Sequence, residues 1–220
     1  MTPRLLTLAL LLAACGGDGP PGRPCDCLGL LCSENDELRS LDLTRSRSHL
    51  ADLEGDGKLD LVTASSDGSL SIAWGHNGQR DYRLHPGGVP DVQLGDLDRD
   101  GYLDLVYITA EPSALHTRIN LGARQFSDGP TIAIAGEARS LWLGRLDADA
   151  SLDAVVASAG ASTITVITDG LTRAVPIVLG RELVAVDLGD LNDDGRLDLV
   201  AVDRSDAAFY VVLAQGDAFA

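Results

Sequence analysis

The chain has 220 residues, of which 45% are hydrophobic, 23% charged and 4% aromatic, a composition typical of a soluble globular protein with an aliphatic core. Its formal net charge of -16 argues against nucleic acid as a partner, because lysine and arginine hold phosphate backbones. Excess acid can instead mark cation sites, and 15 of the 33 acidic residues fall within four similar nine-residue stretches.

The amino terminus, residues 1–14, is typical of a secretory signal peptide. MTPR gives a positive start, and Leu5–Ala14 is an apolar run too short to span a bilayer as a helix. The sequence LAAC, which ends at Cys15, resembles the lipobox of bacterial lipoproteins, in which this cysteine is lipidated. The residue directly after Cys15 is Gly16 and not aspartate, so the resemblance implies anchoring in the outer membrane. The alternative is an ordinary signal peptide cleaved nearby, which would leave the protein secreted and unanchored.

Residues 15–37 are predicted to form a linker that carries the lipid anchor. Gly16–Pro24 is rich in glycine and proline and cannot pack a core. Cys25, Cys27 and Cys32 follow, and an oxidising compartment favours one local disulfide with one cysteine left over. A three-cysteine metal site is the less favoured alternative, and the sequence does not fix the pairing.

The four acidic stretches recur with a regular spacing. They are DLEGDGKLDLV from Asp52, DLDRDGYLDLV from Asp96, RLDADASLDAVV from Arg145 and DLNDDGRLDLV from Asp190. Their second residues, all leucine, lie 44, 49 and 45 positions apart, which is the period of four-stranded propeller blades or of paired-helix repeats. The segments between them alternate or are β-branched and are bounded by turn residues, so the repeat is predicted to be all-β.

Each repeat shows the same predicted order of strands. One strand enters the acidic loop, as Val92–Gly95 does, and a second leaves it through LDLV or its equivalent. Third strands are predicted near 70–74, 117–121, 163–167 and 209–213, and fourth strands near 82–84, 131–134 and 174–179. With its loop motif, the following LDLV and the blade-length period, the sequence resembles the FG-GAP and VCBS repeats of integrin-type β-propellers over residues 38–220. The resemblance implies an all-β fold of four propeller blades.

The two ends of this domain are predicted to complete one another. The last repeat ends after its third strand, whereas Leu38–Leu43 and Arg45–Ala51 offer two strands before the first loop. We expect these amino-terminal strands to complete the carboxy-terminal blade and close the ring, because closure removes open sheet edges. An open arc of four repeats is the alternative.

The acidic loops have the ligand pattern of a calcium site. Carboxylates at positions one, three and five can turn inward, glycine at position six allows the chain to reverse, the carbonyl at position seven can point inward, and position nine closes the loop. The predicted ligands are Asp52, Glu54, Asp56, Lys58 and Asp60 in loop 52–60, Asp96, Asp98, Asp100, Tyr102 and Asp104 in loop 96–104, and Asp190, Asn192, Asp194, Arg196 and Asp198 in loop 190–198. Such hard oxygen donors suit Ca²⁺ rather than zinc or iron. An EF-hand is excluded, because position twelve carries no glutamate and a strand follows.

The loop at 145–153 departs from this pattern. It has Arg145 at the first position and Ala150 in place of the glycine. We expect the Arg145 guanidinium to replace the ion by forming an internal salt bridge with Asp147, Asp149 and Asp153. The protein is therefore predicted to bind three calcium ions.

No catalytic constellation accompanies the loops. The sequence lacks a G-x-S-x-G nucleophile elbow and a phosphate-binding G-x-x-x-x-G-K, so an enzyme is not expected. The resemblance instead implies a calcium-binding module at the cell surface that serves adhesion or binding to a protein or glycan, with the membrane reached only through the lipid. A polysaccharide-acting propeller enzyme and a structural subunit of an envelope assembly are the alternatives.

Overall fold

The computed structural model describes residues 47–64, 69–75, 80–85, 88–147, 149–159, 163–178, 183–203 and 209–214. The predicted signal peptide, Cys15, the linker cysteines and the strand at Leu38–Leu43 lie outside these residues. Every regular element in the described part is a β-strand, and no helix there is long and apolar enough to cross a membrane.

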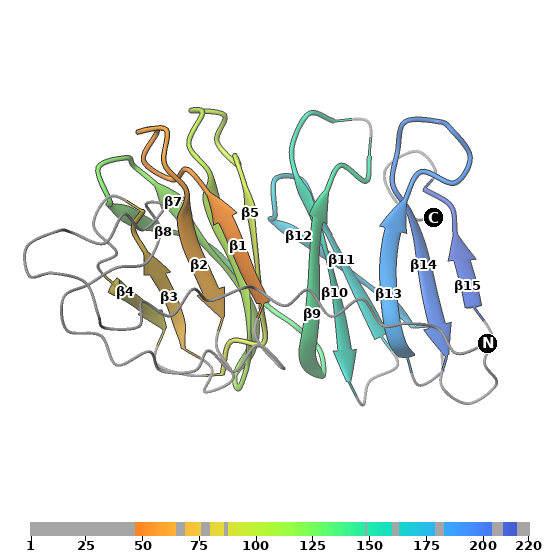
Figure 1. Cartoon of the computed structure of the whole chain (residues 1–220). Coiled ribbons are helices and arrows are strands. Elements are labelled where there is room, and N and C mark those ends of the chain that lie inside the picture. Colours follow the sequence, from red (N-terminus) through yellow and green to blue (C-terminus); the bar gives the residue numbers. More distant parts are fainter. Residues whose placement is uncertain are drawn as a thin grey trace, which may run out of the picture.

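Fifteen strands form four antiparallel sheets, each built by neighbouring strands in chain order (Figure 1). The first sheet contains β1 (Arg47–Ala51), β2 (Asp60–Ala64), β3 (Leu70–Ala73) and β4 (Arg80–His85). The second contains β5 (Asp91–Gly95), β6 (Asp104–Ala110), β7 (Ser113–Asn120) and β8 (Phe126–Ala133). The third contains β9 (Glu137–Gly144), β10 (Asp153–Ala159), β11 (Thr163–Thr168) and β12 (Arg173–Val178). The fourth contains β13 (Leu183–Gly189), β14 (Asp198–Asp203) and β15 (Phe209–Val212).

The sheets follow one another as the blades of a β-propeller do. β1 lies against β5, β5 and β6 lie against β9, and β10 lies against β13. The predicted all-β propeller-type fold with one blade per acidic loop is therefore confirmed. The first and fourth sheets lie at opposite ends of this row (Figure 1), so the described residues form an open arc.

The prediction for Arg45–Ala51 is wrong. Its described part, Arg47–Ala51, does not complete the carboxy-terminal blade but forms β1, which pairs with β2 from Arg47 opposite Ala64 to Ala51 opposite Asp60. The short acidic loop joins β1 directly to β2, so the local hairpin forms in preference to a distant pairing. β5, β9 and β13 have the same place before their own loops.

The second strands of the two middle sheets, β6 and β10, each contribute to two cores, because alternate side chains of a strand point to opposite faces. In β6, Leu105 and Tyr107 pack in the core shared with the first sheet. Val106 and Ile108 pack in the core shared with the third sheet. This arrangement explains why LDLV is apolar on both faces, and it makes each blade the support of the next.

Close packing between neighbouring blades requires glycine at the end of the first strand. A Cβ atom added at Gly95 would lie 2.6 Å from side-chain atoms of Leu143 and Leu152, and one added at Gly144 would lie 2.5 Å from Leu197. Leu152 and Leu197 are the eighth residues of the following loops. Gly95 and Gly144, which end the first strands of the second and third sheets, therefore each receive a leucine from the loop of the next blade, a contact that the sequence pattern alone did not identify.

Candidate metal centre

The four acidic loops have equivalent places in the four sheets. Each loop joins the first strand of its sheet to the second, and all four lie at the same end of the strands (Figure 1). We refer to them as the first (52–60), second (96–104), third (145–153) and fourth (190–198) loops. The fold thus places the predicted ligands of each loop near one another and separates the loops by one blade.

The aspartate at position nine is the buried anchor of each loop. Asp60, Asp104, Asp153 and Asp198 are at most 1% exposed, and one carboxylate oxygen of each accepts the backbone N–H of the loop's second residue at 2.7–2.9 Å. In the first, second and fourth loops the other oxygen accepts a backbone N–H, at 2.8 Å, from a residue that ends the third strand or lies two positions beyond it. These donors are Gly75, Asn120 and Ala214. Burial raises the pKa of Asp60 and Asp104 despite these hydrogen bonds.

The other loop carboxylates accept hydrogen bonds from backbone N–H groups of their own loop. In the first loop, Asp52 accepts the N–H groups of Gly55, Asp56 and Gly57, and the bond from Gly57 contributes most to holding the pKa of Asp52 below its ordinary value. The carboxylate at position five accepts the N–H of position seven in every loop. These donors are Lys58, Tyr102, Ser151 and Arg196. The loops are therefore ordered by their own backbone amides.

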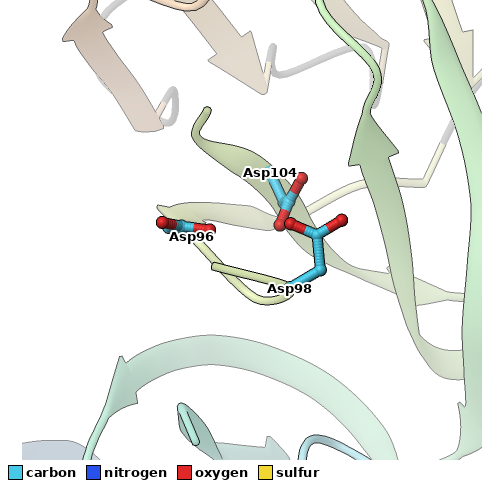
Figure 2. Close-up of side chains that lie close together, drawn as sticks. All are labelled: Asp96, Asp98 and Asp104. Carbon is cyan, nitrogen blue, oxygen red and sulfur yellow. The ribbon is translucent and has the colours of Figure 1, made fainter. Parts of the chain in front are cut away.

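The second loop brings three carboxylates together. Asp96, Asp98 and Asp104 each offer an oxygen, and these oxygens lie within 4.8 Å of one another (Figure 2). The Oδ1 atom of Asp96 is buried and has no hydrogen-bond partner in the described part of the chain, so this acceptor is directed at no donor there. A hard divalent cation fits this donor set of oxygens, and the orphaned oxygen is an observation that a bound cation would explain.

The first loop directs its position-three carboxylate elsewhere. Glu54 forms a bidentate ion pair with Arg124 of the β7–β8 turn, with its Oε2 atom 2.5 Å from Nε and its Oε1 atom 3.0 Å from Nη2. The guanidinium also lies over the ring of Trp74, 5.1 Å from its centroid. The ion pair with Glu54 joins the first blade to the second, and its hydrogen bond raises the pKa of Arg124. Glu54 is therefore held by a cation that the protein itself supplies.

In the fourth loop, Asn192 uses its side chain within the loop. Its Oδ1 atom accepts the N–H of Asp194 at 3.0 Å, and its Nδ2 atom donates to the Asp194 carboxylate at 3.1 Å. Asp190 accepts the N–H groups of Asp194 and Gly195. Arg196 lies near Asp194, with an N···O distance of 3.6 Å, at the surface. The fourth loop makes the same hydrogen bonds to its position-five and position-nine carboxylates as the other loops. Its predicted ligands include one carboxylate fewer than those of the first and second loops.

The salt bridge predicted for the third loop is not formed. Arg145 is exposed, and among the described residues no ion pair joins it to Asp147, Asp149 or Asp153. The acids turn to backbone amides instead, since Asp147 accepts the N–H of Asp149 and Asp153 accepts that of Leu146. An exposed arginine gains little from a surface ion pair, because water screens the attraction and the side chain loses conformational entropy.

The structure places a different partner beside the third loop. Asp147 and Asp149 lie together with Asp169 of the β11–β12 turn, their oxygens within 4.8 Å of one another. Asp153 is fully buried, and none of the residues that the structure describes donates a hydrogen bond to its Oδ1 atom. The sequence analysis missed Asp169 because it lies 16 positions beyond Asp153, after strands β10 and β11, and no motif marks the turn.

The ionisation of Asp153 makes a pH dependence testable. Burial, reinforced by the charges of Asp147 and Asp149, raises the pKa of Asp153 from 3.8 to about 6. A carboxyl group whose pKa is higher in the folded state stabilises the fold fully below pH 3.8, and this contribution is lost as the pH rises through about 6. In chelator, wild-type stability should fall by about 3 kcal/mol over this window relative to Asp153→Asn, as urea unfolding would measure. Parallel pH profiles of the two proteins would contradict the assignment.

The comparisons with known proteins agree with this architecture. Residues 52–107, from the first loop through the second, match the model of the FG-GAP-like repeat. No curated protein matches the chain. Among solved structures, BBS1N in complex with ARL6DN, from a crystal soaked with mercury, is similar with a TM-score of 0.53 and 20% identity. The match covers 75% of this chain and 49% of that one.

A second similar structure is a lectin of Agrocybe aegerita, whose printed subject is recognition of non-reducing terminal N-acetylglucosamine. It has a TM-score of 0.51 and 17% identity, and the match covers 81% of this chain and 51% of that one. At such identities these likenesses show the propeller fold alone. The chain spans about half the length of the solved structures it matches.

Proposed function

We propose that this protein is a calcium-stabilised β-propeller module that binds a protein or glycan ligand at the bacterial cell surface. The FG-GAP-like repeat and the propeller fold support a binding module, since this architecture presents loops on rigid blades. Calcium holds the acidic loops at one end of the sheets, and ligand recognition uses the surfaces that those blades keep rigid. Adhesion is the role that such a module serves at a surface.

The observation that carries the calcium proposal is the carboxylate cluster of the second loop. Asp96, Asp98 and Asp104 converge, and the buried Oδ1 atom of Asp96 has no hydrogen-bond partner among the described residues. Asp100 and the Tyr102 carbonyl would complete the oxygen donors. The bound ion would offset the mutual repulsion of these carboxylates, so its binding is coupled to loop order.

The first and fourth loops would hold the second and third calcium ions. In the first loop calcium competes with Arg124 for the Glu54 carboxylate. We therefore expect the first loop to bind calcium with the lowest affinity of the three. In the fourth loop Asn192 takes the place of one carboxylate. The third loop is not assigned a calcium ion, because Arg145 replaces the first ligand.

The lipid anchor at Cys15 and the outer-membrane location complete the proposal. They rest on the signal-peptide pattern of residues 1–14 and on LAAC. The Gly/Pro-rich segment after Cys15 would hold the propeller away from the membrane.

The proposed function is tested by probing glycan and envelope-protein arrays with the purified chain, in calcium and in chelator. We expect selective binding that is lost in chelator and in Asp98→Asn, while Asp193→Asn, an exposed change outside the predicted ligand set, retains it. Absence of selective binding would contradict the module. Release of reducing ends from a polysaccharide would support the enzyme alternative, and a constant co-purifying envelope partner the structural one.

A further inference from the structure

The first and fourth sheets, at the two ends of the arc, each have one face of the kind that packs against a neighbouring blade elsewhere in the structure. These two faces are complementary. In each internal interface, the leucine at position two of a loop packs toward the following sheet. Leu53 and Leu146 are at most 1% exposed, and Leu97 packs against the core of the second and third sheets. Leu191 has this position in the fourth loop but is 53% exposed. The fourth blade therefore presents a packing surface that no described residue covers.

The face of β15 that points away from the third sheet is also exposed. Tyr210 and Val212 pack in the core shared with the third sheet, so Phe209 and Val211 point to the opposite face. Phe209 pairs with Val202 and is 72% exposed. Its counterparts in the preceding sheets, Leu70, Leu115 and Ile164, are fully buried. An aromatic side chain thus lies exposed at a position that is otherwise internal.

The first sheet presents the complementary half. Leu50 is 55% exposed, although its counterpart in the second sheet, Leu94, packs in the core between the first and second sheets. Leu59 is 46% exposed, whereas Leu103, the same residue of the second loop, also packs in that core. These leucines are the side chains that each later blade inserts into the blade before it.

The glycine contacts identify where such a leucine would insert. Gly95 receives Leu152 and Gly144 receives Leu197, each the eighth residue of the following loop. At Gly189, the equivalent glycine of the fourth blade, no described atom lies within 4 Å of the Cβ position. Gly189 of the fourth blade therefore has space for a leucine but no described leucine there. Leu59 of the first blade is the leucine of this type that packs against no glycine among the described residues.

We propose that two copies of this chain associate head to tail, with the fourth sheet of each packed on the first sheet of the other. One chain carries both complementary surfaces, but they lie at opposite ends of its arc (Figure 1). A second copy supplies each surface with its partner, and a head-to-tail contact that closes forms a ring. The ring would contain eight blades, within the range of about four to eight known for propellers. Closure also covers the apolar surface that each arc exposes.

Light scattering and sedimentation of the full mature chain test this proposal. We expect a particle of twice the chain mass, and we expect Leu50→Glu and Val211→Glu to weaken association by about a hundredfold or more, because each places a charge in an apolar contact. The matched control is Leu121→Glu, which makes the same change at a leucine that is 58% exposed in the β7–β8 turn of the second sheet. This variant should remain a dimer.

A monomeric wild-type chain at high micromolar concentration would overturn the proposal, as would open-ended polymers or dimers that both end variants leave intact. A monomer in which the amides of β1 and β15 are nevertheless protected from exchange would also overturn it, because other segments of the same chain would then cover the exposed faces. Hydrogen exchange of the wild-type protein provides a second readout that does not depend on variant folding. Amides of β1 and β15 should gain protection as concentration rises, whereas those of β6 and β7 should not. Unchanged exchange in β1 and β15 would contradict the dimer.

Discussion

Asp104→Ala is expected to lower the free energy of unfolding by about 4 kcal/mol in chelator, as measured by urea denaturation. The carboxylate is fully buried and accepts the N–H groups of Leu97 and Asn120. Its removal leaves two buried donors unpaired, each costing about 1–3 kcal/mol. Such a loss is a large part of the about 5–15 kcal/mol that stabilises a typical domain.

The effect of Asp104→Ala should extend to the neighbouring blade. Asn120, whose N–H the carboxylate holds, donates its side-chain amide to the carbonyl oxygens of Leu53 at 2.7 Å and of Leu103 at 3.1 Å. Asp104 therefore positions a residue that joins the second blade to the first loop.

Two variants control this measurement. Asp128→Ala removes an aspartate that is 82% exposed and should change stability little. Asp153→Ala removes a position-nine aspartate that accepts only the Leu146 N–H among the described residues and has an orphaned second oxygen, so its cost should be clearly smaller. Equal losses in Asp104→Ala and Asp128→Ala would contradict the anchoring role.

Calcium is expected to raise the thermal midpoint of unfolding substantially. An ion that binds only the folded state, present at a hundredfold excess over its dissociation constant, adds about 2.7 kcal/mol per site. For a domain of this size that corresponds to about 5–10 °C for one occupied site, and three sites would add to one another. Differential scanning calorimetry of the chain with calcium and with chelator measures the shift.

The second loop should account for a separable part of this shift. Asp98 is exposed, and among the described residues its carboxylate accepts a hydrogen bond only from the Asp100 N–H. Asp98→Asn should therefore change stability little in chelator while reducing the gain from calcium. Asp193→Asn is the matched control, because it removes an exposed loop carboxylate that is not a predicted ligand. A midpoint that chelation leaves unchanged would contradict calcium binding.

Much of the fold could be predicted because its pattern is local. The period of the loops, the alternation around each strand and the apolar LDLV segment predicted all-β blades, and the structure has them. The prediction for Arg45–Ala51 failed because a strand that leads into a short loop can equally be read as a spare partner for a distant sheet. Only the register from Arg47 to Ala51 against β2 decides between the two.

The site was predictable only in part. The spacing of Asp96, Asp98 and Asp104 indicated a cluster, and the backbone path of the loop brings them together. In contrast, Arg124, Asn120 and Asp169 reach the loops from other turns, and no spacing rule connects them to the acidic motif. Charge alone suggested that Arg145 would pair with the acids of its own loop, but their oxygens face backbone amides and Asp169.

The sequence by itself determined the repeat, the strands and the chemistry of the loop ligands, because these depend on residues close together in the chain. The tertiary structure decided which carboxylates face a protein cation, which face one another, and that the ends of the arc are exposed. These properties depend on how one blade packs on the next, through contacts such as Gly95 with Leu152 and Glu54 with Arg124. Such contacts join residues from different repeats, and their geometry exists only once the blades are packed.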